Sequence, residues 1–312
     1  MPLTVRRPPG PARPATRLHT LPRQVAGTGF RVPWDGLAPD PGEHPCRRLD
    51  MSIAQSARVE DVLLGGKTHF PADLAAARQV LDGDEAAEQR AVDRKRFRTL
   101  AAAHLAHLPG ADQLIDFGCG LPLPPRLLQA SGPGFAELHR LAAPGSTMVH
   151  VDKDPLVMTH ARALLAAPPD GAVHVRHHEA DFADPDGVLG RSGVPVAWDR
   201  PVALLFFDVL HETPNARTVV DAYKAAVRPG SWLVISHRSA DSPAGCAEAD
   251  GYRVAGLPYS ARTREEIAAL VEGWELLGPG VAPVREWSPS LSPTDPRARR
   301  RANGYAVIAR KP

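Results

Sequence analysis

The chain has 312 residues, of which 43% are hydrophobic, and its formal net charge is +2. This length allows one large domain or two smaller ones, while the small net charge argues against a strong nucleic-acid field and no apolar run reaches the roughly 20 residues that span a bilayer. Three cysteines, odd in number and far apart, argue against a disulfide framework and a zinc site, so we expect a cytoplasmic protein.

The first 50 residues are rich in Pro, Gly and Arg and show no sustained period. This composition predicts a disordered or loosely packed extension over residues 1–50. The N-terminus carries charge but no apolar core, which argues against a secretory signal.

A helical region is expected next, over residues 51–110. From Asp73 to Leu108, Ala, Leu, Glu and Arg dominate and apolar residues recur at three- and four-residue spacing. The break at 82–84 divides this pattern, so the sequence predicts two helices.

The segment 63-LLGGKTHF-70 contains Gly-Lys-Thr, which is how a phosphate-binding P-loop ends. A P-loop also needs a glycine five places before Gly66, and Asp61 stands there. The preceding residues are mixed and polar rather than a buried strand. The sequence therefore argues against a nucleoside triphosphate site.

Short apolar runs then alternate with helical segments, which predicts a mainly parallel sheet with helices on both faces. The expected strands are 113–117, 147–151, 172–176, 201–207 and 231–236, and the expected helices are 123–130, 134–142, 155–167, 185–191 and 215–227. A further helix over 263–271 begins with a capping box of Thr263 and Glu266. Two more strands are expected, over 274–287 and 304–311.

Polar residues follow the expected strands, where ligands sit in open α/β folds. The first strand runs into 116-DFGCGLP-122, a backbone-approach turn, but Leu123 breaks the dinucleotide fingerprint. Asp152 ends the second strand, where an acid can accept both ribose hydroxyls. After the third strand, Asp181 can bind the adenine amine and Phe182 can pack on the ring.

Taken in chain order, these turns resemble the class I S-adenosylmethionine methyltransferases over roughly residues 55–312. SARVEDVLLGGKTHFPAD, DFGCGLPLP, HVDKDPLVMTHARALL and RPVALLFFDVLHETP are similar to an actinobacterial methyltransferase family formerly catalogued as a domain of unknown function. That family opens with an R-V-Y-D-Y-L-L-G-G-K-D-N-F type of segment. Here Glu60 and Val62 replace its tyrosines, and Thr68 and His69 replace its Asp-Asn pair.

The resemblance implies a Rossmann-like fold with seven strands, the last one antiparallel. It also implies an N-terminal helical lid over 51–110 and a cofactor-binding domain over 111–312. The implied cofactor is S-adenosylmethionine, held by Gly65, Gly66, Lys67, Asp116, Gly118, Cys119, Gly120, Asp152, Lys153, Asp181, Phe182 and Asp208. For the Gly-Gly-Lys segment a helix-ending glycine pair with a solvated lysine remains the alternative.

We expect methyl transfer to a small molecule, in specialised metabolism, by a monomer or homodimer that binds neither nucleic acid nor membrane. In-line displacement needs a base only when the acceptor must lose a proton. The candidates are His211, Glu212 and His237, each with structural hydrogen bonding as its alternative. No metal is expected, because His177 and His178 point to opposite faces of a strand.

Two other functions stay open at this point. A regulator or pseudoenzyme would bind S-adenosylmethionine without transferring its methyl group. An NAD(P)-dependent oxidoreductase would share the strand-and-helix pattern, but Leu123 disfavours it because the dinucleotide fingerprint needs glycine there.

Overall fold

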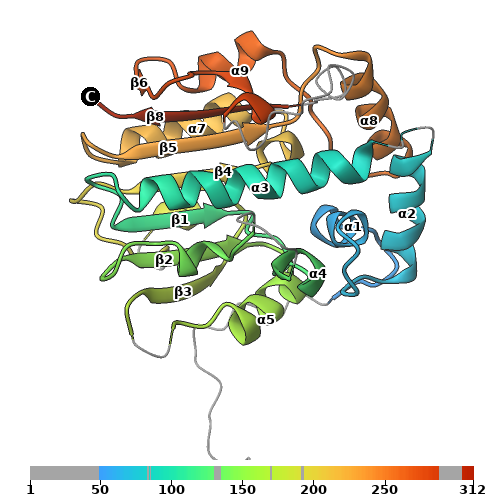
Figure 1. Ribbon diagram of the computed structural model, residues 1–312, viewed down its shortest axis with the longest axis horizontal. Helices are drawn as coiled ribbons and strands as arrows, with labels where there is room; N and C mark the ends of the chain where they lie inside the picture. Colours follow the sequence, from blue (N-terminus) through green and yellow to red (C-terminus); the bar gives the residue numbers. More distant parts are fainter. Residues whose placement is uncertain are drawn as a thin grey trace, which may run out of the picture. The chain divides into compact units, whose positions relative to one another are not determined.

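Strands that are buried on both faces form the middle of the fold (Figure 1). The structure is a computed structural model, and it describes residues 49–82, 84, 86–129, 135–168, 171–190, 193–287 and 304–312. These residues belong to one compact unit, Arg47–Pro312. The expected extension lies outside the described residues except for its last two, Leu49 and Asp50. The boundary expected between a lid and a cofactor domain at residue 110 remains a prediction.

The sheet is parallel over five strands and antiparallel at one side, as expected. Across the sheet the strands are β3 (His174–Glu179), β2 (Thr147–Asp152), β1 (Gln113–Phe117), β4 (Ala203–Phe207), β5 (Trp232–His237), β8 (Tyr305–Arg310) and β6 (Glu275–Leu276), while β7 (Ala282–Pro283) pairs with β8. The register is parallel from β3 to β5, and β8 runs antiparallel to β5. Every residue of β1, β4 and β5 is buried, because helices cover both faces of these central strands.

The helices divide between the two faces of the sheet and the carboxyl ends of its strands. They are α1 (Ser56–Leu63), α2 (Pro71–Leu81), α3 (Ala87–Leu105), α4 (Pro125–Leu128), α5 (Pro155–Leu164), α6 (Pro185–Leu189), α7 (Ala216–Ala226), α8 (Pro243–Val254) and α9 (Arg264–Leu270), with 3-10 turns η1 (Leu138–Arg140), η2 (Leu210–Glu212) and η3 (Val284–Glu286). Figure 1 shows α3 in front of the sheet and α7 behind it. Phe97 and Leu105 of α3 pack on one face, and Val220 and Tyr223 of α7 pack on the other.

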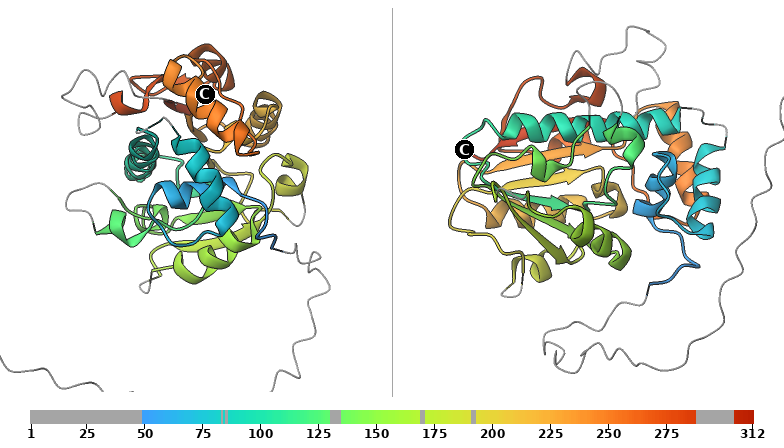
Figure 2. Two further views of the ribbon diagram at one scale, coloured as in Figure 1. Left: turned by 90° about the vertical axis from the view of Figure 1, so that its right-hand side faces the viewer. Right: turned by 60° about the horizontal axis from the view of Figure 1, so that its bottom comes forward.

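The helices α1, α2 and α8 lie beyond the strand ends, as Figures 1 and 2 show, and their side chains form a separate apolar cluster. Val59 and Leu63 of α1 meet Ala77 and Val80 of α2 and Tyr252 of α8 in this cluster. Together these helices stand over the edge of the sheet at which parallel strands present their ligand-binding turns.

Several expected elements differ from the observed ones. The segment 274–287, expected as one strand, forms β6, a turn in which Gly280 N donates to Leu277 O at 2.8 Å, β7 and η3, so the sheet has eight strands within the described residues. The expected helix 134–142 is reduced to η1, and its first residue lies outside the described ranges. The helix α1 lies in the region 51–110 that was expected to be helical, although its bounds were not predicted, and α8 was not expected. The capping box of Thr263 and Glu266 is present. None of the helices in the described ranges is long and apolar enough to cross a membrane.

Candidate functional site

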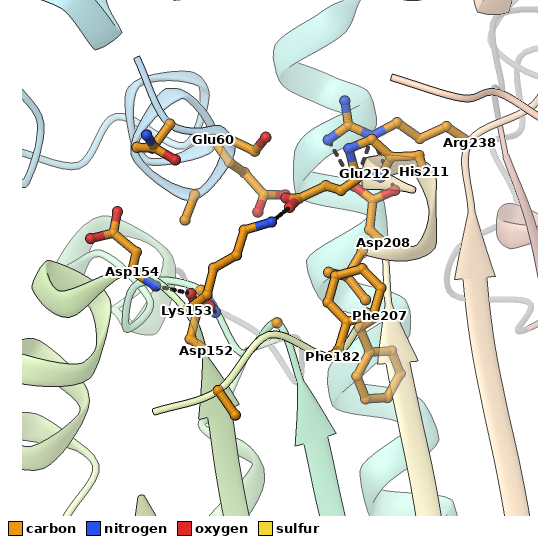
Figure 3. A pocket seen from close by; sticks show the side chains of 17 residues that line it. Glu60, Asp152, Lys153, Asp154, Phe182, Phe207, Asp208, His211, Glu212 and Arg238 are labelled. Carbon is orange, nitrogen blue, oxygen red and sulfur yellow. Dashed lines mark hydrogen bonds and ion pairs between the residues drawn. The ribbon is translucent and has the colours of Figure 1, made fainter. Parts of the chain in front are cut away.

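The strand order reverses at β1, because the chain proceeds from β1 to β2 on one side while β4 flanks β1 on the other. A cavity lies at this point of the sheet. Such a switch point leaves a crevice beyond the carboxyl ends of the strands. Residues of α1 and residues that follow β1, β2, β3, β4 and β5 line the cavity (Figure 3). Five strand ends and one covering helix therefore converge on a single site.

The glycine turn after β1 forms part of the cavity lining. Gly118 and Gly120 have φ angles of +59° and +68°, in the left-handed region that glycine adopts without strain. A Cβ on Gly118 would lie 2.2 Å from Val209 Cγ2, whereas a Cβ on Gly120 would meet nothing closer than Lys95 Nζ at 3.9 Å. Gly118 is thus required for packing, and Gly120 leaves open space beside its backbone.

Asp152 ends β2 with its carboxylate fixed in the cavity wall. The backbone N–H of Gly120 donates to Oδ2 at 3.0 Å, and that of Asp154 donates to Oδ1 at 2.9 Å. Burial raises the pKa of Asp152 to about 7, although the two backbone donors oppose the rise, and nearby Glu212 adds to it. The carboxyl group is therefore held rigidly and titrates near neutral pH.

Lys153 extends across the cavity toward Glu212, as Figure 3 shows. Its Nζ lies 3.2 Å from Glu212 Oε2 and 3.6 Å from Asp181 Oδ2. Burial lowers the pKa of Lys153, but Glu212 and Asp181 outweigh burial and the pKa is raised. Burial raises the pKa of Glu212 against the effect of Lys153. This ion pair links the ends of β2 and β4 across the site.

Glu60 and Lys95 form a second ion pair at the cavity, and the sequence reasoning missed it. Glu60 projects from α1 into the cavity, and its Oε2 lies 2.9 Å from Lys95 Nζ of α3. Its Oε1 is buried and has no hydrogen-bond partner among the described residues. Glu60 stands where the family pattern has a tyrosine, and this difference was the signal that could have revealed the ion pair.

Asp208, at the end of β4, is already bound on both oxygens. Arg238 Nε donates to Oδ1 and Oδ2, each at 3.1 Å, and Arg94 Nε lies 2.7 Å from Oδ2. Burial raises its pKa, but Arg238 and Arg94 outweigh burial and hold the pKa below its usual range. Glu248 of α8 approaches the same two arginines at 3.3 Å. Asp208 is thus a charged member of a buried network.

His211 and His237, both expected as candidate bases, have different environments. His211 lies on η2 and lines the cavity, and neither of its ring nitrogens has a partner within the described part of the chain. Burial, followed by Arg238, holds its pKa well below the usual value. His237 does not line the cavity. Its Nδ1 lies 2.7 Å from Arg238 O and its Nε2 lies 2.9 Å from Arg262 Nη1.

The structure brings many of the expected site residues together. Those that line the cavity are Gly118, Gly120, Asp152, Lys153, Phe182, Asp208, His211 and Glu212. Cys119, Asp181 and His237 do not line it, and neither does Asp116, whose Oδ2 binds Arg98 at 2.7 Å and His150 at 3.0 Å.

The Gly-Gly-Lys segment lines a second cavity rather than this one. Gly65 and Gly66 end α1 with N–H bonds to Val62 O and Asp61 O, and Lys67 is exposed. Asp61 Oδ2 accepts the Thr68 N–H at 2.8 Å. This geometry is that of a helix-ending glycine pair, so Asp61 stabilises the turn after α1. A role for Lys67 in ligand binding remains a prediction.

Comparisons with known proteins agree on one family. The model of a family described as "S-adenosyl methyltransferase" matches residues 42–312. A protein of unknown-function family 574 from Streptomyces avermitilis is 30% identical, with a TM-score of 0.74, over 85% of this chain and 100% of its own. A candidate methyltransferase from Thermobifida fusca is 33% identical, with a TM-score of 0.71, over 84% of this chain and 97% of its own. A search of curated proteins gave no match.

The family match covers most of the chain, and the two solved structures, both from actinobacteria, share its fold. The cavity lies where enzymes of this architecture bind their cofactor. The chain therefore belongs to the S-adenosyl methyltransferase family and is an S-adenosylmethionine-dependent methyltransferase.

Proposed function

We propose that this chain transfers the methyl group of S-adenosylmethionine to a small-molecule acceptor of specialised metabolism, and that both bind in the cavity at the β1–β4 switch point. The observation that carries this proposal is Asp152, whose carboxylate is oriented by two backbone N–H groups in the cavity wall. α1 covers the cavity with residues that include Ser56 and Glu60, which favours a small acceptor over a macromolecular one.

The cavity residues fit the nucleoside half of the cofactor. Each oxygen of Asp152 accepts one backbone N–H, and a carboxylate oxygen has a further lone pair for a ribose hydroxyl. Ala180 and Phe182 supply apolar surface for the adenine ring after β3. Asp181 lies next to them but outside the lining, paired with Lys153, so we propose for it a weaker, positioning role.

The ion pair of Glu60 and Lys95 fits the amino-acid half. Its opposite charges are 2.9 Å apart and lie beside the open space at Gly120. An α-amino acid carries an ammonium and a carboxylate at a similar separation. We propose that the unpartnered Oε1 of Glu60 accepts the ammonium and that Lys95 binds the carboxylate.

Bound S-adenosylmethionine supplies a methyl group on a positively charged sulfur atom. An acceptor attacks the methyl carbon in line with its bond to sulfur. The chain itself contributes orientation and exclusion of water, because the strand ends fix one side of the cavity and α1 covers another. Lys153 crosses the cavity, and we propose that it moves toward Asp181 when the cofactor binds.

Calorimetric titration with S-adenosylhomocysteine tests the cofactor site, with ATP and NADH as controls. We expect binding of the homocysteine compound alone, and a loss of at least tenfold in affinity in Asp152→Asn because two ribose hydrogen bonds weaken. Asp112→Asn is the matched control, since this exposed carboxylate pairs with Arg200 at the opposite end of β1. Binding of NADH, without binding of S-adenosylhomocysteine, would refute the proposal.

Turnover separates an enzyme from a regulator that merely binds the cofactor. Protein loaded with methyl-labelled S-adenosylmethionine should pass the label to a compound in an extract of small metabolites. Tight cofactor binding, with no labelled product from any small-molecule extract, would favour the regulator.

A further inference from the structure

Three aromatic side chains, of which His211 lines the cavity, meet beside it and hold polar atoms that have no hydrogen-bond partner among the described residues. The ring of His211 lies 5.2 Å from that of Tyr259 and 6.3 Å from that of Tyr252, and the two tyrosine rings are 4.9 Å apart, all between centroids. Both imidazole nitrogens and both phenol oxygens are buried without a hydrogen-bond partner in the described chain. Buried polar atoms of native proteins are nearly always paired, so this cluster calls for an explanation.

The lack of hydrogen bonds at these polar atoms is not explained by a poorly anchored backbone. The N–H of Ser260 donates to His211 O at 2.7 Å, which ties the segment after α8 to η2. Arg262 donates to the carbonyl oxygens of Leu210 and Thr213 at 3.0 and 2.8 Å. The backbone on both sides of the cluster is therefore fixed, and the three side chains form a built site.

The surroundings of the cluster are positively charged. Arg238 Cζ lies 4.4 Å from the ring centroid of Tyr252 and 5.4 Å from that of Tyr259. Tyr252 Oη lies near this guanidinium without the geometry of a hydrogen bond. Asp208 and Glu248 offset Arg238 and Arg94, but Arg262 binds backbone carbonyls and His237 rather than a carboxylate. Within the described ranges Arg262 thus forms no ion pair with a carboxylate, and its positive charge acts on His211.

The protonation states follow from burial and from these charges. Burial and then Arg238 hold the pKa of His211 far below its usual value, so the imidazole is neutral and carries one N–H. Burial raises the pKa of Tyr252 and Tyr259, so both hydroxyls keep their protons. The cluster therefore offers three hydrogen-bond donors in a positive field.

We propose that His211, Tyr252 and Tyr259 form the acceptor subsite and that they bind an acceptor whose nucleophile is an anionic oxygen, a carboxylate or an ionised phenol-type hydroxyl. This inference rests on the proposed methyl transfer. Donors and nearby cations stabilise an oxyanion and repel an ammonium group. His211 lines the cavity, and its ring is close enough to Tyr259 for one bound oxygen to contact both.

The charge balance of the reaction agrees with this assignment. The acceptor oxygen forms a bond to the methyl carbon, the electron pair of the broken carbon–sulfur bond stays on sulfur, and the negative and positive charges cancel without movement of a proton. A base is then unnecessary. His211, which the cations make a poor base, acts as a hydrogen-bond donor that positions the oxyanion.

Titration of protein saturated with S-adenosylhomocysteine tests the subsite, with four probes in mildly alkaline buffer. Benzoate and 4-nitrophenolate are anionic, benzyl alcohol is neutral and benzylammonium is cationic. We expect one or both anions to bind at least tenfold more tightly than the other two, and the stronger anion identifies the carboxylate or phenol class. Tyr259→Phe should lower the affinity for the anion about tenfold, because a hydrogen bond to a charged group is lost. The affinity for S-adenosylhomocysteine should stay unchanged.

Tyr305→Phe is the matched control, because its hydroxyl lies outside the cavity beside Asp241; we expect it to leave all affinities unchanged. Absence of S-adenosylhomocysteine binding would contradict the proposed function itself. If S-adenosylhomocysteine binds, the subsite is wrong when no anion binds, when benzylammonium binds as tightly as the anions, or when Tyr259→Phe has no effect.

Discussion

Asp152 shows that ligand binding and stability oppose one another at a single residue. Its carboxyl pKa is about 7 rather than 3.8, mainly because the group is buried. At 1.36 kcal/mol per unit, the charged form destabilises the folded protein by on the order of 4 kcal/mol. For a carboxyl whose folded pKa is raised, this loss develops as the pH rises from about 4 to about 7 and is constant above. The backbone donors that orient the carboxylate keep it in the site despite this cost.

The affinity for S-adenosylhomocysteine is therefore expected to depend on pH. Ribose hydroxyls donate to the carboxylate form of Asp152, so the dissociation constant should be constant above pH 7 and should rise up to about tenfold per unit below it. Calorimetric titration across this range measures the effect. Glu212→Gln should move the midpoint to lower pH, because Glu212 contributes to the raised pKa.

Asp152→Asn provides the matching stability experiment. The variant lacks the buried charge, so we expect its melting temperature above pH 7 to exceed that of the natural protein although it binds S-adenosylhomocysteine poorly. An affinity that stays flat between about pH 5 and pH 8 would show that Asp152 does not titrate in this range.

The strand-end residues could be read from the sequence, but their partners could not. Asp152 and Gly120 each follow an apolar run, so their place at the cavity was predictable from the pattern alone. Glu60 binds Lys95 across 35 positions, and Arg238 binds Asp208 across 30. No local period reports such pairs, since they form only when α1, α3 and β5 meet at the strand ends.

At the level of elements, the turn between β1 and α4 contains Gly118 and Gly120, which are needed for different reasons. We expect Gly118→Ala to destabilise the fold by about 3 kcal/mol or more, because the left-handed φ is strained in alanine and the Cβ would collide with Val209. Gly120→Ala shares the φ penalty of roughly 1–2 kcal/mol without a collision. Its methyl group would instead occupy cavity space beside Lys95.

Urea unfolding and calorimetric titration together separate these two effects. Gly118→Ala should lose mainly unfolding free energy, whereas Gly120→Ala should lose cofactor affinity out of proportion to its stability. Equal losses of stability in the two variants would show that contact with Val209 does not govern the turn.

The elements themselves were predictable to different degrees. The strands β1, β4 and β5 came from short, mainly apolar runs, which mark strands buried on both faces. The bounds of α1 and the whole of α8 were missed because their buried faces carry charges: Arg58 and Asp61 in α1 and Glu248 in α8 are each at most 5% exposed. A helix that buries ion pairs lacks the apolar stripe by which a helix is recognised.

At the level of the whole described unit, buried ion pairs join α1 to the rest of the fold. Arg58 Nε lies 2.9 Å from Asp154 Oδ2 at the start of α5, and Arg58 Nη1 lies 3.6 Å from Asp73 Oδ2 in α2. Arg126 of α4 donates to Leu63 O at 3.3 Å. Since α1 also lines the cavity, bound cofactor and these ion pairs should stabilise the same helix.

We expect the amides of α1 to exchange with solvent more slowly when S-adenosylhomocysteine is bound, as followed by hydrogen–deuterium exchange with peptide resolution. Protection should extend to Gly118, Gly120 and 152–154, which line the cavity, and should be absent from α9, which packs on the far face of the sheet. Arg58→Met should weaken this protection and destabilise the protein by about 3–5 kcal/mol, because two buried carboxylates lose their cation. Arg217→Met, which breaks exposed pairs with Asp221 and Glu272, should cost less than about 1 kcal/mol and leave the protection of α1 intact. If the exchange rates of the α1 amides are the same with and without S-adenosylhomocysteine, bound ligand does not stabilise α1. The covering role assigned to this helix would then be wrong.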